Sequence, residues 1–336
     1  MLSLSHRHIV CLQRNGAAFA NHLVPPLSLD VGEPGVLERF KDCISIPPLD
    51  AGMRYTQVAA GGSNYTLLLR SDGKVIAAGN PGDGQTDIPP LPKGLKYAAC
   101  AASGEFSAHL RSDGTVIVCG NDLDDDDVGL VPPPLPKGVT YIQVSCGAYT
   151  IVLLRSDGTA VACGDNRSGQ CEIPELEQGV HYTQVAAGQW HTVFLRSDGR
   201  VVASGHGEPH VVDSRLPPFL WRYRYSYQGE CTIPDLPPGT WYTQVDASDQ
   251  LTVLLRSDGR AVACGVNDCG QCNIPPLYGG LHYTQVCAGC RCTVLLRSDG
   301  TLTHSGLVDP SRLCPGWWDE QRFAMSPIGA ISHPEL

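Results

Sequence analysis

Short runs of apolar and small residues alternate with polar turns along nearly the whole chain. Residues 182–188 and 191–196 form two such runs, rich in the β-branched, aromatic or small side chains that suit strands. Asp198 and Gly199 then supply a two-residue turn before a third run at 200–205, because Asp-Gly accepts the positive φ of a tight hairpin. The pattern predicts a unit of three short antiparallel strands. An Ile-Pro-x-Leu segment follows most units, and its proline excludes a central strand and indicates an outer strand or a connecting loop.

This unit repeats with a period of about 41 residues. The string Leu-Arg-Ser-Asp-Gly occurs six times, and a degenerate seventh copy, residues 8–16, lies upstream. Insertions lengthen some intervals, and the two ends of the chain can jointly complete one unit, so seven units fit. A unit of three or four short strands cannot bury both of its faces alone, whereas radial stacking of such units does. We therefore predict an all-β fold, a seven-bladed β-propeller whose ring is closed by the N- and C-terminal segments.

The expected domain organisation is a single propeller. It spans residues 1–336, with insertions at about 17–45, 122–131 and 206–230 and a closing tail at about 307–336.

The first unit lacks the Tyr-Thr-Gln-Val run that begins the others. In complete units this tyrosine lies 24 residues after a turn glycine, as from Gly158 to Tyr182. The same distance after Gly300 is position 324, beside Phe323. We predict that residues 322–326 supply the missing strand to the first blade and so remove an open edge.

Composition narrows the classes of partner and compartment. The chain carries 24 Lys and Arg against 34 Asp and Glu, a net charge of −10, which argues against an extended nucleic-acid surface. No apolar run approaches the roughly 18 to 20 residues needed to cross a bilayer. We expect a cytoplasmic or nuclear protein. Residues 1–29 contain Arg7 and Arg14 but no acid, which leaves organellar targeting open.

The 15 cysteines include a pattern close to that of a zinc ribbon. Cys269 and Cys272 form one Cys-x-x-Cys pair, and Cys287 and Cys290 form another. However, Cys272 lies at the repeat position of Cys171 in another unit, so the pattern follows partly from the repeat. We expect reduced, buried thiols and predict no metal or other cofactor.

The Val-Ala-Ala-Gly, His-Thr-Val and Asp-Gly strings, followed by Cys-Gly-x-Asn and Gly-Gln, resemble the regulator of chromosome condensation repeat. The Gly-Gln-x-x-Ile-Pro form at 84–89 and 270–275 is similar to repeats of a propeller-type β-lactamase inhibitor protein and of large ubiquitin ligases. The resemblance covers nearly the whole chain and implies the propeller fold. Its members include an exchange factor for a small GTPase, ubiquitin-ligase substrate modules and enzyme inhibitors, so the fold does not choose among these functions.

Two departures from the repeat contain candidate partner-binding residues. The first is an acidic loop that lacks the glycine and terminal glutamate of a calcium loop, so we interpret it as a solvated charge run that steers a basic partner. The second is an insertion rich in Trp, Tyr and Arg, the residue types of binding hot spots; packing onto its own blade is the alternative. The candidates are Asp124, Asp125, Asp126, Asp127, Trp221, Arg222, Tyr223, Arg224, Tyr225 and Tyr227, together with Trp190.

The remaining polar positions favour structural roles. His8 and His191 share one register, and we expect both to be hydrogen-bonded core residues. The six arginines of Arg-Ser-Asp-Gly form a ring by symmetry, and we expect them to pair with nearby acids. No Ser/His/Asp set, paired-carboxylate motif or phosphate-binding loop recurs, so no catalytic residue is predicted.

We therefore expect a non-catalytic scaffold that presents propeller loops to a protein partner. A regulator of a small GTPase, an exchange factor in type, or an enzyme inhibitor is one alternative. A substrate-recognition component of a ubiquitin ligase is another.

Overall fold

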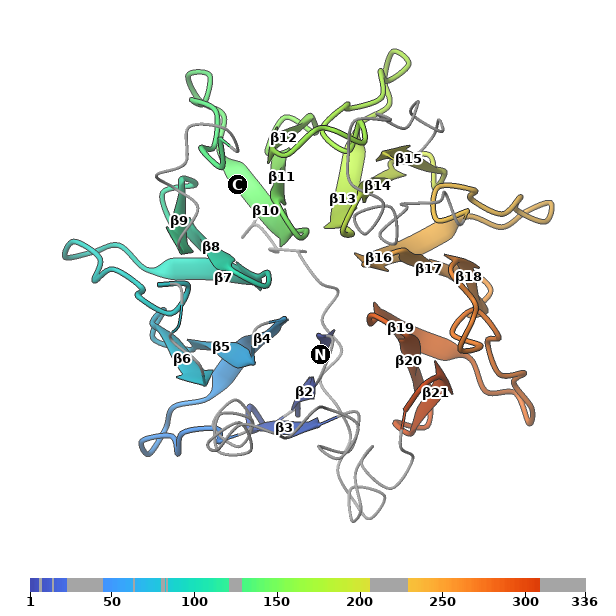
Figure 1. Ribbon diagram of the computed structural model, residues 1–336, viewed down its shortest axis with the longest axis horizontal. Helices are drawn as coiled ribbons and strands as arrows, with labels where there is room; N and C mark the ends of the chain where they lie inside the picture. The colour runs from blue at the N-terminus through green and yellow to red at the C-terminus, as the bar shows by residue number, and fades with distance from the viewer. Residues whose placement is uncertain are drawn as a thin grey trace, which may run out of the picture.

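The computed structural model describes residues 1–5, 8–13, 15–22, 45–62, 64–79, 82, 84–120, 129–205 and 229–308. These residues form seven three-stranded antiparallel sheets, and Figure 1 shows them as blades around a central axis. Strands follow chain order in every sheet, from the inner strand at the axis to the outer strand at the rim. The predicted seven-bladed propeller is confirmed.

The blades are numbered 1 to 7 in chain order. Inner strands are β1 (Leu2–Leu4), β4 (Tyr55–Gly61), β7 (Tyr97–Ala102), β10 (Tyr141–Cys146), β13 (Tyr182–Ala187), β16 (Tyr242–Ser248) and β19 (Tyr283–Ala288). Middle strands are β2 (His8–Leu12), β5 (Tyr65–Arg70), β8 (Phe106–Arg111), β11 (Thr150–Arg155), β14 (His191–Arg196), β17 (Leu251–Arg256) and β20 (Cys292–Arg297). Outer strands are β3 (Ala18–His22), β6 (Val75–Gly79), β9 (Val116–Gly120), β12 (Ala160–Gly164), β15 (Val201–Gly205), β18 (Ala261–Gly265) and β21 (Leu302–Gly306).

The hydrophobic core lies between neighbouring blades. Between blades 4 and 5, for example, Val152 and Leu154 pack against Tyr182 and Phe194, all at most 2 % exposed. Each blade therefore buries both faces only by stacking on its neighbours, which explains why the unit must be repeated around a ring.

Polar side chains fasten one blade to the next. Gln184 of blade 5 donates from Nε2 to the Val245 carbonyl of blade 6, and its Oε1 accepts from the Val245 N–H, both at 3.0 Å. This pairing satisfies two buried backbone groups that face the neighbouring blade. The same clamp joins Gln57 to Cys100, Gln143 to Val185 and Gln244 to Val286.

Blade 1 takes its inner strand from the start of the chain. β1 pairs with β2, with Leu2 opposite Cys11 and Leu4 opposite Ile9. The prediction that residues 322–326 supply this strand is therefore wrong, and those residues lie outside the described part of the chain. The Tyr-Thr-Gln-Val string does not occur at the N-terminus, because the β1 residues take the later positions of the inner strand.

The predicted insertion at 17–45 also begins too early, because Ala18–His22 is the outer strand of blade 1. Its sequence, Ala-Phe-Ala-Asn-His, lacks the glycine that ends the other outer strands, so the repeat pattern did not reveal it.

The Ile-Pro-x-Leu segment, left open between strand and loop, is a connecting loop, since residues 173–176 belong to no strand. Proline cannot donate a ladder hydrogen bond, which accounts for this outcome.

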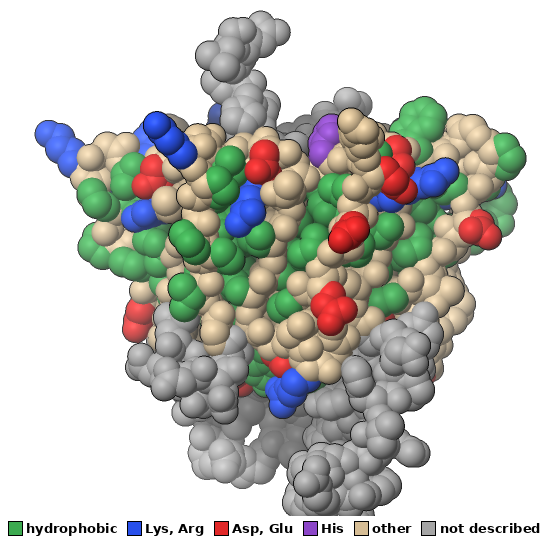
Figure 2. All heavy atoms as spheres, turned by 90° about the horizontal axis from the view of Figure 1, so that it is seen from above, with side chains coloured by type: hydrophobic (Ala, Val, Ile, Leu, Met, Phe, Trp, Pro, Cys, Tyr) green, Lys and Arg blue, Asp and Glu red, His purple; other side chains and the backbone are tan. Residues whose placement is uncertain are grey.

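The propeller has two distinct ends. We call the end that carries the loops between inner and middle strands the loop face, and the end that carries the Ser-Asp-Gly turns the turn face. Because the strands of a blade alternate in direction, every outer strand also ends at the loop face. Seen edge-on in Figure 2, acidic and basic side chains are interspersed over the described surface. None of the described residues forms a helix of the length and apolarity that a membrane crossing requires.

Candidate functional site at the loop face

The inner strands and the loops that follow them surround a central cavity of about 260 Å³. Small side chains line much of its wall, among them Ala59, Ala60, Ala187 and Ala288. Small side chains fit this position, because the inner strands lie nearest to the axis of the ring.

The cavity carries negative charge. Its lining includes the carboxylates of Glu105, Asp246 and Asp249, and no Lys or Arg is found among the described lining residues. Met1 also lines the cavity, and burial lowers the pKa of its α-amino group to about 6, so at neutral pH this group is largely uncharged. A cavity with this lining favours a cationic group over an anionic one.

Asp246 is the most unusual of these residues. In the other blades its register holds a small side chain, such as Ser145 or Ala186. Its carboxylate accepts hydrogen bonds from the N–H of Ala288 in blade 7 at 2.8 Å and from the N–H of Ala247 at 3.0 Å. Burial raises the pKa of Asp246 to about 6, and the hydrogen bonds from these N–H groups oppose that rise.

Asp249 follows β16 in a strained backbone conformation. Its φ is +38°, inside the left-handed region that side chains other than glycine rarely adopt. Its carbonyl accepts the Gln189 N–H of blade 5 at 2.9 Å, which helps to hold this conformation. Burial, and then the adjacent Asp249, raise the pKa of the Cys290 thiol in blade 7. Strain of this kind is concentrated at functional positions in many proteins.

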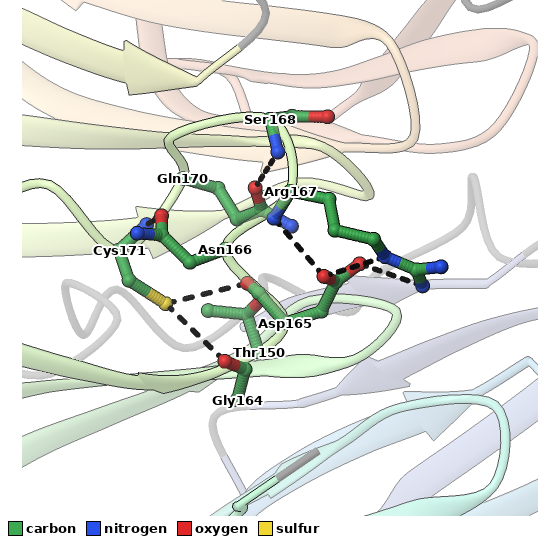
Figure 3. A network of polar contacts seen from close by, with 8 residues as sticks. All are labelled: Thr150, Gly164, Asp165, Asn166, Arg167, Ser168, Gln170 and Cys171. Carbon is green, nitrogen blue, oxygen red and sulfur yellow. Dashed lines mark hydrogen bonds and ion pairs between the residues drawn. The ribbon is translucent and has the colours of Figure 1, made fainter. Parts of the chain in front are cut away.

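An exposed arginine stands on the loop after β12 (Figure 3). The Arg167 side chain is 79 % exposed, and its Nε and Nη2 donate to the 6 % exposed carboxylate of Asp165 at 2.9 and 3.1 Å. The Asp165 N–H in turn donates to the Tyr149 carbonyl on the inner-to-middle loop of blade 4. A buried carboxylate thus fixes the direction of a surface guanidinium, which lowers the entropy lost when a partner binds it.

The same loop is braced from within. The Ser168 N–H donates to Gln170 Oε1 at 2.9 Å, and the Cys171 thiol donates to the Asp165 carbonyl at 3.4 Å, as Figure 3 shows. These contacts account for the polar Asp-Asn-Arg-Ser-Gly-Gln string at 165–170.

The predicted binding residues have different outcomes. Trp190 is only 5 % exposed, and its ring lies 6.4 Å from that of Tyr149, so it contributes to packing beneath the loop face and offers a partner little surface. The other candidates lie outside the described residues: Asp124, Asp125, Asp126, Asp127, Trp221, Arg222, Tyr223, Arg224, Tyr225 and Tyr227.

Sequence reasoning missed Glu105, Asp246, Asp249 and Arg167. A signal for two of them was present, because Val-Asp-Ala-Ser-Asp stands in blade 6 where blade 5 has Val-Ala-Ala-Gly-Gln.

The described cysteines are free thiols. Cys272 and Cys287, which the zinc-ribbon spacing would combine, donate to different carbonyls, those of Val266 and Leu2. Burial raises the pKa of Cys272 to about 11, so the metal-binding thiolate is disfavoured. Within the described ranges, no three His, Cys, Asp or Glu side chains are grouped closely enough to hold a metal ion.

The two histidines and four of the six arginines of the repeat have the predicted structural roles. His8 Nε2 lies 2.9 Å from Thr66 Oγ1, and His191 Nε2 lies 2.8 Å from Thr252 Oγ1, so both buried rings join neighbouring blades. Four of the repeat arginines pair with the aspartate of their own turn: Arg70 with Asp72, Arg111 with Asp113, Arg196 with Asp198 and Arg256 with Asp258.

Comparison with known families agrees with this architecture. The model of the Regulator of chromosome condensation (RCC1) repeat matches residues 55–85, 141–170 and 182–208. These three regions therefore match the repeat that the sequence resembles. No curated protein sequence is similar enough to this chain to count as a match.

Several solved structures share the fold at low sequence identity. Prp20p from Saccharomyces cerevisiae is 17 % identical, with a TM-score of 0.62 over 97 % of this chain and 86 % of that one. Human WBSCR16 is 17 % identical, with a TM-score of 0.62 over 88 % of this chain and 86 % of that one. The CRINKLY WD40 ectodomain of the Arabidopsis thaliana receptor kinase ACR4 is 16 % identical, with a TM-score of 0.61 over 93 % of this chain and 96 % of that one. At such identities the likeness establishes the fold alone.

Proposed function

We propose that this propeller is a non-catalytic scaffold that binds a protein partner at its loop face, with a basic side chain of the partner entering the acidic cavity. The observation that carries the proposal is that residues outside the repeat pattern gather at one end of an otherwise regular ring. Glu105, Tyr149 and Asp249 lie on inner-to-middle loops, and Arg167 lies on the loop after an outer strand. Both kinds of loop belong to the loop face.

Two outer strands end at the loop face directly before the predicted binding segments in the chain. Gly120 and Gly205 each end an outer strand at the loop face, and the chain continues from there into the segments that contain the acidic run and the Trp-Arg-Tyr string. Loops carry binding residues on many rigid scaffolds because they can vary without disturbing the core.

The size and charge of the cavity indicate what it accepts. About 260 Å³ is slightly below the ~300–1,000 Å³ typical of sites for drug-sized ligands. That volume suits one extended Lys or Arg side chain better than a bulky cofactor. Three carboxylates in a recessed wall would attract such a side chain and raise the rate of association at low salt.

The similar structures support partner binding as a use of this fold. Prp20p was described together with its binding properties toward Gsp1p and histones, and yeast RCC1 (Prp20) was solved bound to Kap60. For this chain, regulation of a small GTPase, enzyme inhibition and ubiquitin-ligase substrate recognition are finer versions of the same proposal. The acidic cavity favours a partner with a protruding basic segment in each case.

The proposal is tested by matched charge removal. Glu105→Gln with Asp246→Asn removes two cavity carboxylates, whereas Glu175→Gln with Asp235→Asn removes two exposed acids from the connections between blades. A partner captured from lysate is identified and purified, and its affinity for each variant is measured at low and high salt.

We expect the cavity pair to weaken binding at least tenfold and to reduce its salt dependence, while the control pair changes the affinity less than threefold. Equal effects of the two pairs would show that only overall charge matters. Arg167→Ala is also expected to weaken the complex. Because Arg167 lies on the loop face but does not line the cavity, this variant shows whether the partner contacts the loop face beyond the cavity. Retained affinity in all loop-face variants would place the binding surface elsewhere.

A further inference from the structure

The turn face presents non-repeating side chains on a regular backbone frame. In six blades, the serine of the Ser-Asp-Gly string binds the residue that precedes the inner-strand tyrosine of the same blade. Ser257 Oγ, for example, accepts the Trp241 N–H at 3.1 Å, and the Ser257 N–H donates to the Trp241 carbonyl at 2.8 Å. The residues held in this way are Arg54, Lys96, Thr140, His181, Trp241 and His282.

Each of these residues also covers the turn glycine of the preceding blade. A Cβ added to Gly199 would lie 2.4 Å from the Cβ of Trp241, and one added to Gly259 would lie 2.4 Å from the Cβ of His282. We call such a residue the covering residue, and we call the residue that directly follows the turn glycine the exit residue. A covering residue and an exit residue therefore lie beside the same turn glycine.

The side chains at these two positions favour positive charge. The exit residues are Ala17, Lys74, Thr115, Thr159, Arg200, Arg260 and Thr301. Together the two sets contain five Lys or Arg and no acid, although the chain as a whole carries a net charge of −10. Threonine at several of these positions shows that the fold itself requires neither a basic nor an aromatic side chain there.

The aspartates of the turns are bound within their own turns. Asp198, for example, accepts the N–H of Arg200 at 3.1 Å and pairs with Arg196. Aspartates in five other turns accept the N–H of their exit residue in the same way. In contrast, the side chains of Arg200 and Arg260 form no ion pair with any residue that the structure describes. Their charges are therefore available to a partner.

Two neighbouring turns bring these features together. Trp241 lies between the turn of blade 5, whose Gly199 it covers, and the turn of blade 6, whose serine binds its backbone. Arg200 follows Gly199, and Arg260 lies with the covering residue His282 at the turn of blade 6. Trp241 is 53 % exposed, in contrast to the buried Trp190. An exposed indole is thus flanked by two arginines and an imidazole.

We propose that this cluster is a docking site for an acidic segment of a second protein. An apolar side chain of the segment packs on the indole of Trp241, and its carboxylates bind Arg200 and Arg260. Trp and Arg are among the residue types that dominate the energetics of protein interfaces. A guanidinium can also bind a carboxylate through two parallel hydrogen bonds, which adds specificity to the attraction. Because the backbone beneath these side chains is already fixed, less entropy is lost when the segment binds.

The aspartates between the cations favour a protein segment over a nucleic acid. A nucleic-acid backbone carries a negative charge at every nucleotide, so it would bring charge close to Asp198 and Asp258 as well as to the arginines. A peptide can place its carboxylates at the arginines and neutral residues elsewhere. This site lies at the opposite end of the ring from the acidic cavity, and the inference does not depend on the partner proposed there. With both sites in use, the propeller would join a basic partner to an acidic one.

Fluorescence anisotropy with a labelled peptide tests the proposal. The probe alternates glutamate and glycine around one central phenylalanine and is titrated with the full chain at low and high salt. Arg200→Thr with Arg260→Thr removes the two cations, and Trp241→Thr removes the indole. Threonine already occupies the exit position in blades 3, 4 and 7 and the covering position at Thr140, so these variants should keep the fold. The matched control, Lys93→Gln with Lys137→Gln, removes the same charge from exposed positions in the connections between blades.

We expect saturable binding that weakens as salt is added. The arginine pair and Trp241→Thr should each weaken it roughly fivefold or more, whereas the lysine pair should change it less than about twofold. A peptide with glycine in place of its phenylalanine should bind the wild type more weakly but should bind Trp241→Thr as the original peptide does.

The absence of saturable binding to the wild type would overturn the proposal. Equal losses in the arginine and lysine pairs would also overturn it, because only overall charge would then matter, and so would unchanged affinity in Trp241→Thr. A single-stranded oligonucleotide of equal charge that binds more tightly than the peptide, and depends on the same two arginines, would assign the site to nucleic acid instead.

Discussion

Replacing His109 with leucine should remove from blade 3 a group that lowers the free energy of unfolding at acidic pH. The imidazole is fully buried in β8, at a position where blades 2 and 4 have Leu68 and Leu153. Ser107 Oγ donates to a backbone carbonyl, so it accepts from His109 Nε2 at 2.8 Å and fixes the neutral tautomer with the proton on Nε2. Nδ1 has no hydrogen-bond partner among the described residues, so a proton added there would be buried without an acceptor.

The size of the effect follows from the pKa of His109. Burial lowers it from 6.5 to about 4. Between these values the unfolded chain binds a proton that the folded chain does not, so the free energy of unfolding falls as the pH drops from 6.5 toward 4 and is fully recovered above 6.5. At 1.36 kcal/mol for each tenfold change in proton affinity, the loss is roughly 3 kcal/mol.

The assay is urea unfolding of the wild type and of His109→Leu between pH 4.5 and pH 8. We expect the leucine variant to be equally or more stable at pH 7.5, and its advantage to grow by roughly 2–3 kcal/mol at pH 4.5. Other groups that titrate are common to both proteins, so they cancel in the difference.

His282→Gln, which removes an exposed imidazole, serves as the control for loss of a histidine at the surface. Parallel stability curves for His109→Leu and the wild type would refute the reasoning, because they would mean that His109 is protonated equally in the folded and unfolded states.

Two further predictions concern the blade interfaces. Gln184→Ala leaves the Val245 N–H and carbonyl without their partners and should lower the free energy of unfolding in urea by roughly 2–4 kcal/mol. The neighbouring Thr183→Ala should lower it by less than about 1 kcal/mol, because Thr183 is exposed. Equal losses in the two variants would contradict the role of Gln184 in joining blades 5 and 6. Gly199→Ala should lower the melting temperature more than Gly179→Ala does. Both glycines have a positive φ, so both variants strain the backbone. However, a Cβ at position 199 would lie 2.4 Å from Trp241 Cβ, whereas a Cβ at position 179 would meet no atom within 4 Å. Equal shifts would mean that backbone strain alone sets the cost.

The repeat determined most of the fold in advance. Its period, the Asp-Gly turns and the β-branched runs each reflect local preferences, and such preferences can be read from neighbouring residues without knowledge of the rest of the chain. The same logic assigned His8 and His191 to the core, because a polar residue that recurs in a strand register has a recurring partner.

The ends of blade 1 were assigned incorrectly for a related reason. Leu2–Leu4 and Ala18–His22 keep the strand geometry but not the repeat signature, since strand pairing depends on the backbone and tolerates many side chains. Recurring strings therefore mark the middle strand of this blade but not the strands on either side of it.

The candidate site could not be read from the sequence. Glu105, Asp246 and Asp249 come from blades 3 and 6, and only closure of the ring brings their loops to one cavity. Arg167 was visible as a charged loop residue, but its fixed direction depends on the burial of Asp165.

The sequence by itself thus determined the repeated unit, the number of blades and the absence of a recurring catalytic motif, because these depend on short-range patterns. Tertiary structure decided which non-repeating residues meet and which tryptophan is buried. Those properties depend on contacts between residues far apart in the chain, as between Tyr149 and Trp190 or between Leu2 and Cys287, and no local pattern encodes them.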